Sequence, residues 1–284
     1  MNKGLKKFFH ALGTPWVALD LGCKFSAANR KARKYHADPA TLPIEKRYLY
    51  VYKLVRRVLY LFSVKSYTSG FKKCPKVPTL FVVNHKSLCD GLLIFKHLWE
   101  NGDIPYFRMI AKGELGKGKI ASVMHLIDSI LINRNNIRDT ANLFKEEIKP
   151  SLDKKSFVVF PEGTRIYDDQ KIGEFKSGSF RIGTDHYLPI VPIVIYGSSG
   201  VGWKENKTFL NKNKQVFISV LPEIKHPEYI SRNVVSVADE VRYLMEKEYK
   251  RIDEIVSRQP DKFVKDPHIV FETLDSDEKK DNKR

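Results

Sequence analysis

Short apolar runs alternate with longer segments of helical spacing from about residue 80 onward, and this alternation sets the expected fold. Compact runs rich in β-branched residues predict buried strands at 80–83, 105–112, 129–132, 156–160, 190–196 and 217–221. Apolar positions three and four residues apart predict helices at 45–64, 91–100, 120–127, 139–148 and 234–257. Strands that alternate with helices predict an α/β fold, with a mostly parallel, mixed sheet and helices on both faces.

The first 68 residues have a different pattern, which predicts an N-terminal helical segment that associates with membrane. His10, Pro15 and Asp20 interrupt the first apolar run, so this start resembles a signal peptide only superficially and is expected to be retained. On the helix 45–64 one face is cationic and the opposite face is apolar, as in Lys46, Lys53, Arg56 and Arg57 against Tyr48, Val51, Val55, Val58, Leu59 and Phe62.

A basic amphipathic helix suits a protein that lies on anionic lipid, although the apolar face of a single such helix more often packs against the protein's own core. Because two such segments are adjacent in a cationic chain, we expect them to dock on a membrane. No run of about 18 apolar residues is present, so no ordinary membrane span is expected. Turn residues around Ser69 and Gly70 mark a boundary, which divides the chain into a helical docking segment (1–68), an α/β domain (69–265) and a charged, disordered tail (266–284).

The charge balance narrows the class of partner. Among 284 residues, 50 are Lys or Arg and 33 are Asp or Glu, a formal net charge of +17. Such an excess indicates nucleic acid, an anionic membrane surface or phosphorylated substrates, or else a proteome that places lysine on every surface. The cysteines, Cys23, Cys74 and Cys89, are too few and too scattered for a disulfide framework or a zinc site, so a reducing interior is expected.

The strand 80–83 ends in a group of chemically useful side chains: Asn84, His85, Ser87 and Asp90. In open α/β sheets, ligands bind just beyond such strand ends. An aspartate five residues after a histidine, across a turn, can accept one ring N–H and leave the other nitrogen as a proton acceptor. By itself such a pair is more often structural than catalytic, and Ser87 remains open as a hydroxyl nucleophile.

Two later strands also end in polar residues, Arg134 after 129–132 and Glu162 to Arg165 after 156–160. Neighbouring parallel strands release their side chains at one edge of the sheet, so these groups are expected to converge. Arg165 offers a planar fork for a phosphate, and Arg134 and Lys112 would add charge, whereas each cation alone would be read as a surface ion pair. The turn around Gly163 would leave its backbone N–H free to approach a ligand.

Two of these blocks carry a resemblance. Residues 84–90 (NHKSLCD) and 160–165 (FPEGTR) resemble the signature blocks of the glycerolipid acyltransferase family, typified by the 1-acyl-sn-glycerol-3-phosphate acyltransferases. Residues 131–134, 175–178 and 188–193 are similar to further blocks of that family, and the resemblance covers roughly residues 65–220. The chain departs from the family at Asp128, where a glycine is usual, and at Ile166, where a serine is common.

The resemblance implies an O-acyltransferase that uses no cofactor and no metal. His85 would be the general base and Asp90 its orienting carboxylate, while Gly163 N–H would stabilise the oxyanion. The remaining members of the implied substrate site are Asn84 and Ser87, which brace the turn, and Lys112, Arg134, Glu162, Thr164 and Arg165, which hold the glycerol phosphate. The implied reaction moves an acyl group from acyl carrier protein or acyl-CoA to the sn-2 hydroxyl of lysophosphatidic acid and gives phosphatidic acid.

The implied location is the cytoplasmic face of the cell membrane, held peripherally or monotopically by the phospholipid surface. Within the same family, another lysophospholipid or glycerol 3-phosphate remains open as the acceptor. A metal-dependent phosphohydrolase built on His85, Asp90 and Glu162 lacks the further His and Asp clustering that such ions need. A basic membrane-binding or nucleic-acid-binding protein without catalysis would explain the charge, but no recognised nucleic-acid motif is present and no nucleic acid is expected.

Overall fold

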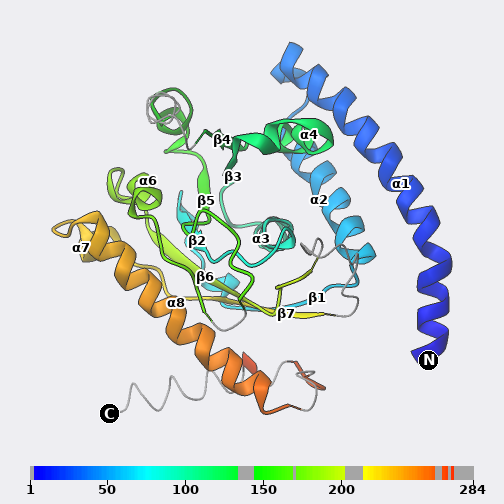
Figure 1. Cartoon of the computed structure of the whole chain (residues 1–284). Coiled ribbons are helices and arrows are strands. Elements are labelled where there is room, and N and C mark those ends of the chain that lie inside the picture. The colour runs from blue at the N-terminus through cyan, green and yellow to red at the C-terminus, as the bar shows by residue number, and fades with distance from the viewer. Residues whose placement is uncertain are drawn as a thin grey trace. The chain divides into compact units, whose positions relative to one another are not determined.

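The computed structural model describes residues 3–133, 144–168, 171–201, 214–259, 264–267 and 270–271, with backbone alone up to residue 18 (Figure 1). By its contacts the chain forms two compact units. One consists of Met1–Ser63 with Phe107–Pro150, and the other of Val64–Tyr106 with Ser151–Arg284. These units are defined by contacts alone, so the predicted domain boundaries at residues 68 and 265 stay a prediction.

The second unit is built on a sheet with the strand order β1-β7-β6-β2-β5. The strands are β1 (Lys65–Ser69), β2 (Leu80–Val83), β5 (Ser156–Val159), β6 (Ile190–Tyr196) and β7 (Gln215–Val220). Neighbours run parallel in this sheet except for β6 and β7, which are antiparallel. The prediction of a mostly parallel, mixed sheet is therefore confirmed.

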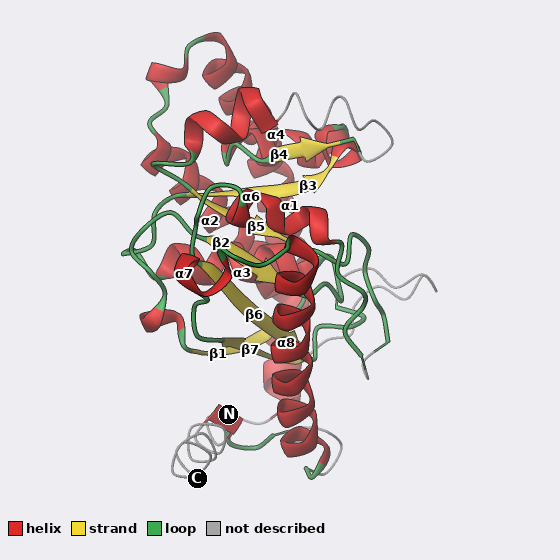
Figure 2. Ribbon diagram, turned by 90° about the vertical axis from the view of Figure 1, so that its left-hand side faces the viewer, coloured by secondary structure: helices red, strands yellow, loops and turns green. Residues whose placement is uncertain are grey.

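Helices cover both faces of this sheet. Figures 1 and 2 show α3 (Cys89–Glu100) and α8 (Val234–Ser257) on opposite sides of β2 and β6. Because both faces are covered, every residue of β2 and of β5 is buried, which explains why all of these residues except Ser156 are apolar. Helix α8 begins at Val234, where the Asn233 side chain accepts the Ser236 N–H at 2.8 Å. Short helices α6 (Arg181–Thr184) and α7 (His226–Tyr229) complete the α-helices described in this unit.

The first unit contains three α-helices within its described residues and a parallel pair of short strands. The helices are α1 (Lys3–Ala37), α2 (Ile44–Leu61) and α4 (Ala121–Leu126), and the strands are β3 (Phe107–Lys112) and β4 (Ile130–Ile132). The structure describes the predicted helix 139–148 only from residue 144, where a π-helical turn spans Phe144–Ile148. None of the described helices combines the length and the hydropathy that crossing a membrane requires.

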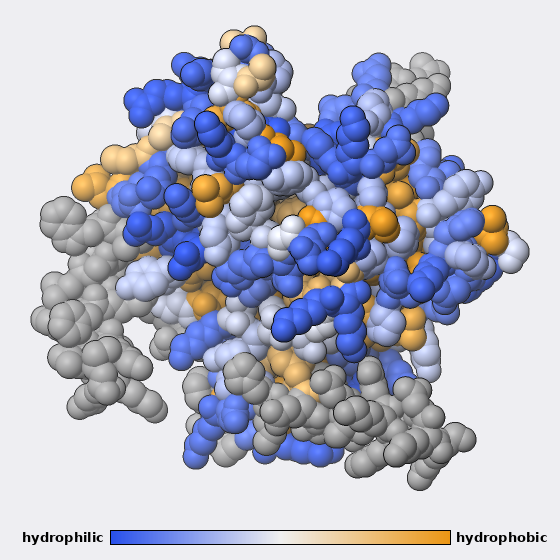
Figure 3. Space-filling model, turned by 180° about the vertical axis from the view of Figure 1, so that it is seen from behind, coloured by the Kyte–Doolittle hydropathy of each residue, from blue (hydrophilic) through white to orange (hydrophobic). Residues whose placement is uncertain are grey.

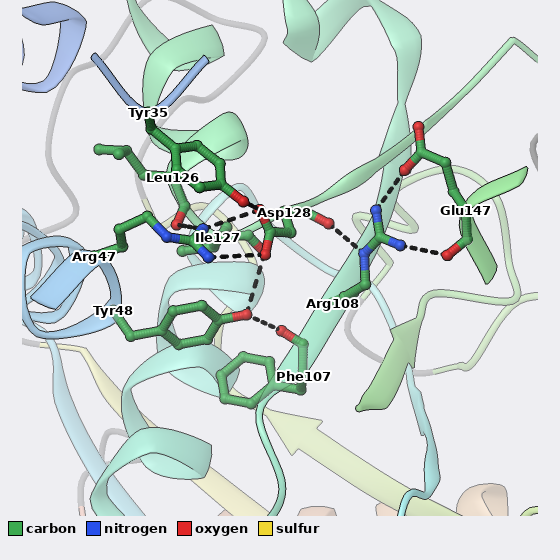
Figure 4. A network of polar contacts seen from close by, with 9 residues as sticks. All are labelled: Tyr35, Arg47, Tyr48, Phe107, Arg108, Leu126, Ile127, Asp128 and Glu147. Atoms are coloured by element: carbon green, nitrogen blue, oxygen red, sulfur yellow. Dashed lines mark hydrogen bonds and ion pairs between the residues drawn. The ribbon is translucent and has the colours of Figure 1, made fainter. Parts of the chain in front are cut away.

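A buried polar network organises this first unit around Asp128 (Figure 4). Arg47 donates to both carboxylate oxygens of Asp128, at 2.9 and 3.1 Å, and Arg108 Nε donates to the Asp128 carbonyl at 2.6 Å. The φ angle of Asp128 is 50°, in the left-handed region that favours glycine and that Asp tolerates better than most residues. Asp128 therefore keeps the backbone conformation that suits the glycine usual at this position in the family. It adds a carboxylate, which is hydrogen-bonded to Arg47.

The amphipathic helix α2 corrects one expectation. Its cations Lys46, Lys53, Arg56 and Arg57 are exposed, whereas its apolar residues Tyr48, Val51, Val55 and Leu59 are buried in the protein and Val58 and Phe62 are half-buried. Tyr48 stacks edge-on against Phe107, and its hydroxyl donates to the Phe107 carbonyl at 2.5 Å. Most of the apolar face of α2 therefore packs in the core, and the side chains that this helix exposes include its cations together with Leu49 and Tyr60. On the face shown in Figure 3, hydrophilic residues predominate and the hydrophobic ones are scattered.

The element boundaries otherwise follow the sequence pattern closely, with two differences. Strand β1 was not predicted, because Lys65–Ser69 is polar and only half-buried at the edge of the sheet. The N-terminal segment and the basic stretch after it form one continuous helix, α1. Most of the predicted tail, 266–284, lies outside the described residues.

Candidate active site

His85 and Asp90 meet across the turn that joins β2 to α3. His85 Nδ1 lies 3.0 Å from Asp90 Oδ2, and the Asp90 side chain is fully buried. The same oxygen accepts the backbone N–H groups of Lys86 and Ser87, at 2.6 and 2.7 Å. Ser87 Oγ donates to the other oxygen, Oδ1, at 2.9 Å. The carboxylate is therefore fixed from several directions, and it in turn fixes the imidazole.

The His85 ring is partly accessible to solvent. Its side chain is 22% exposed and packs on Phe160, with ring centroids 4.4 Å apart. Among the described residues none hydrogen-bonds to the second ring nitrogen, Nε2. With Nδ1–H donating to Asp90, this nitrogen can accept a proton from a bound hydroxyl. Ser87 does not fit as a nucleophile, because it is buried and its hydroxyl proton is directed to Asp90.

The backbone of His85 is hydrogen-bonded to the second signature block and to the residue that follows it. Glu162 Oε1 accepts the His85 N–H at 2.9 Å, and the Ile166 N–H donates to the His85 carbonyl at 2.8 Å. His85 and Glu162 are 77 positions apart in the chain, yet the two blocks form one hydrogen-bonded structure. The predicted convergence of His85, Asp90 and the Glu162–Arg165 segment is thus seen in the geometry.

Glu162 is itself buried, at 4% exposure. Burial raises the pKa of its carboxyl to about 6, while the His85 N–H and the nearby Lys86 cation act in the opposite direction. Its second oxygen, Oε2, has no partner at full hydrogen-bond geometry in the described part of the chain, although the nearby Gly173 backbone N–H also lowers the pKa of this carboxyl. The Glu162 carboxyl thus lies beneath the histidine turn and is bonded to the His85 N–H, and its predicted contact with the glycerol phosphate stays a prediction.

The end of the second block faces outward. Thr164 is exposed, and the half-buried Arg165 guanidinium lies 5.7 Å from the centre of the Tyr167 ring. No carboxylate of the described residues lies within ion-pair distance of Arg165. Gly163, at φ 70°, uses its N–H to close the turn on the Phe160 carbonyl at 3.1 Å. The amide on which the oxyanion prediction relied is therefore already engaged in the turn.

The other predicted site residues have separate positions. Asn84 is fully buried and exchanges two hydrogen bonds with the backbone of Ile195, at 2.9 and 2.7 Å, so it braces the end of β2 against β6. Lys112 ends β3 in the first unit, where its exposed ammonium pairs with Glu114 at 2.5 Å. Arg134 lies outside the described residues. The roles of Lys112 and Arg134 stay predictions.

Lys86, between His85 and Ser87, was not among the predicted site residues, because a lysine in a turn is ordinarily exposed. It is fully buried in the structure. No sequence signal distinguishes it from the other lysines of the chain. Among the described residues, no group of three or more His, Cys, Asp or Glu side chains is arranged to hold a metal ion.

A histidine oriented by a buried carboxylate, in a turn hydrogen-bonded to the segment that carries Arg165, is an arrangement that can activate a hydroxyl of an anionic substrate. The comparisons with known proteins specify the class. The family model described as Acyltransferase matches residues 65–196. A crystal structure of the 1-acyl-sn-glycerophosphate acyltransferase PlsC from Thermotoga maritima shares the fold, with a TM-score of 0.63, 21% identity and coverage of 87% of this chain and 97% of that one.

Curated relatives give the family. A probable 1-acyl-sn-glycerol-3-phosphate acyltransferase of Mycoplasma pneumoniae is 37% identical over 181 residues, which is 64% of this chain and 67% of the relative. Its counterpart in Mycoplasma genitalium is 35% identical over 194 residues, 68% of this chain and 72% of the relative. The human alpha enzyme of that name is 29% identical, over 68% of this chain and 66% of its own length. The chain belongs to this acyltransferase family.

Proposed function

We propose that this acyltransferase moves a fatty acyl group from an acyl thioester to the free sn-2 hydroxyl of 1-acyl-sn-glycerol 3-phosphate. The observation that carries the proposal is the His85–Asp90 pair, hydrogen-bonded at 3.0 Å and joined through the His85 backbone to the segment that bears Arg165. An acceptor with a hydroxyl near a phosphate matches a base whose turn is bonded to the segment of Arg165, a guanidinium that no described carboxylate neutralises. The relatives named above carry this substrate in their names.

The chemistry follows from the geometry. His85 Nε2 takes the proton of the acceptor hydroxyl as its oxygen attacks the thioester carbonyl carbon, and the buried Asp90 carboxylate stabilises the imidazolium that forms. When the tetrahedral intermediate collapses, the carbon–sulfur bond breaks and the imidazolium returns the proton to the leaving sulfur. No acyl-enzyme is needed, in keeping with the burial of Ser87. A positioned base of this kind contributes roughly 10²–10⁴ in rate.

Arg165 is proposed to bind the acceptor phosphate, with Thr164 beside it. A guanidinium presents a planar pair of donors that fits phosphate oxygens, and the Tyr167 ring at 5.7 Å limits where the guanidinium can lie. Lys112 and Arg134 remain proposed as additional cations of this subsite. Glu162 is proposed to act from beneath, through its bond to the His85 N–H.

We further propose that the protein works at the cytoplasmic face of the cell membrane, where a lysophospholipid acceptor resides. The cationic side of α2 and the net charge of +17 support attraction to anionic lipid. The same charge suits either donor, because acyl carrier protein and acyl-CoA are both anionic. Because most of the apolar face of α2 is buried, flotation of the protein with anionic vesicles should fall steeply as salt increases.

A direct assay tests the proposal. Purified protein is offered lysophosphatidic acid, lysophosphatidylcholine or glycerol 3-phosphate, each with acyl-CoA or acyl carrier protein. Phosphatidic acid should form from the first acceptor, and His85→Ala should abolish it while His226→Ala, a histidine outside both signature blocks, should not. Faster acylation of either other acceptor, or near wild-type turnover by His85→Ala, would overturn the assignment.

A further inference from the structure

Lys86 is a fully buried cation whose side chain extends from the turn that bears His85 to the segment that follows Arg165. Its Nζ donates to the backbone carbonyl of Asp168 at 2.6 Å and to that of Lys171, and it lies 4.9 Å from the centre of the Tyr249 ring on α8. Burying an ammonium costs much free energy unless such partners compensate. A methionine would fill similar space without that cost. The buried charge is therefore best explained by the backbone carbonyls to which it is hydrogen-bonded.

The partners of Lys86 belong to the segment that follows Arg165. One end of this segment is bound to the catalytic turn by the Ile166 N–H on the His85 carbonyl, and the far end is closed by the Lys176 N–H on the Pro161 carbonyl at 2.9 Å. Between them Gly173 lies against Glu162, since a Cβ there would come within 2.9 Å of Oε2. The ammonium supplies the hydrogen-bond donor for two carbonyls between these ends.

The same cation acts on the carboxyl that supports His85. The Lys86 charge lowers the pKa of Glu162 against the larger effect of burial, so it favours the ionised carboxylate that accepts the His85 N–H. Lys86 also contributes its backbone N–H to Asp90 Oδ2 at 2.6 Å. One residue therefore connects the base, its carboxylate support and the segment after Arg165.

We propose that Lys86 is a positioning residue for the acceptor site, because its buried ammonium fixes the segment next to Arg165 against the turn that bears His85. The proposal rests on the proposed function for what Arg165 binds. In this proposal Lys86 maintains the distance between the Arg165 guanidinium and His85 Nε2. That distance must match the spacing between the phosphate and the hydroxyl of the acceptor. Lys86 touches neither substrate.

Kinetics separate this role from a merely structural one. Lys86→Met should raise the KM for lysophosphatidic acid on the order of 10-fold, since small misplacements of a binding group cost up to roughly 10² in rate. The KM for the acyl thioester should stay near the wild-type value. Lys86→Arg, which keeps the charge, should recover part of the loss. The matched control is Lys171→Met, which removes a 69% exposed ammonium from the same segment and leaves its backbone carbonyl in place.

An equal effect on both substrates, a loss confined to kcat, an unchanged KM, or the same loss in Lys171→Met would each overturn the proposal. Where Lys86→Met does not fold, Lys86→Gln takes its place. Failure of both neutral variants to fold would also count against the proposal, because the ammonium would then serve folding rather than positioning.

Hydrogen exchange tests the contact without any assumption about the reaction. In Lys86→Met the amides of Ile166 and Lys176, which close the segment, should exchange about 10-fold faster or more, while those within α8 keep their protection. Unchanged exchange at both amides would show that Lys86 does not hold the segment, whatever the activity. Wild-type protein that fails to acylate lysophosphatidic acid would instead refute the proposed function and leave the exchange result standing.

Discussion

Replacement of Asp90 by asparagine isolates the electrostatic part of the mechanism. The backbone N–H groups of Lys86 and Ser87 both donate to Oδ2, so they should hold the amide oxygen of the new side chain at that position. This amide oxygen would then still accept the His85 Nδ1–H, and the base would keep its tautomer. What is lost is the negative charge opposite the imidazolium and the Ser87 hydroxyl bond to Oδ1, where the amide nitrogen now donates instead of accepting.

The magnitude follows from the 3.0 Å separation of His85 Nδ1 and Asp90 Oδ2. At an effective dielectric constant of about 20, unit charges at that distance attract by roughly 5 kcal/mol, which is an upper limit because the amide dipole retains part of the stabilisation. A loss of about 3–4 kcal/mol corresponds to a fall of roughly 10²–10³ in kcat. Folding should change little, since the contacts to the two backbone N–H groups and to His85 persist.

The assay measures kcat with saturating donor and acceptor, together with thermal unfolding. Asp90→Ala serves as the contrasting variant, because it leaves two buried N–H groups unpaired at about 1–3 kcal/mol each and should lower stability as well as rate. A kcat for Asp90→Asn within about fivefold of wild type would refute the reasoning, since so small a change, about 1 kcal/mol, leaves no place for imidazolium stabilisation.

Three further variants test other parts of the structure. Arg165→Ala should raise the KM of the acceptor on the order of 10-fold or more with little effect on the donor, and a fall in donor affinity instead would remove the phosphate assignment. The raised Glu162 pKa, about 6 against 4.5, stabilises the fold below pH 4.5 relative to higher pH, and this contribution is lost as pH rises through 6. Glu162→Gln should therefore gain stability relative to wild type between these pH values, by about 2 kcal/mol in denaturant titrations, and a pH-independent difference would contradict the shifted pKa. Asp128→Gly should destabilise the protein by about 3–5 kcal/mol in the same titrations although glycine suits the backbone, because the buried Arg47 loses its carboxylate and keeps only neutral partners such as the Leu126 carbonyl; an equal or higher stability would show that this ion pair is dispensable.

Most of the fold could be predicted because its signals are local. The unbroken apolar run at Leu80–Val83 indicates a strand that is buried on both faces. The apolar spacing of Val234–Ser257 indicates a helix that is buried on one face. The structure has both elements at the expected positions. Strand β1 gave no such signal, since an edge strand is only partly buried and Lys65–Ser69 is polar. The sequence likewise could not show whether the apolar face of α2 packs against lipid or against the protein core, because both environments favour the same apolar residues.

The candidate chemistry of the site could be read from the sequence: a histidine and an aspartate five positions apart at a strand end, and an arginine at the end of a second block. The groups that support these residues from beneath became visible only in the folded chain. Glu162 takes the His85 N–H, the Gly163 N–H is used by its own turn, and the Lys86 ammonium is buried against backbone carbonyls of a distant segment. This division arises because a residue type fixes which bonds a side chain can form, whereas burial and partners depend on segments that meet only when the chain folds.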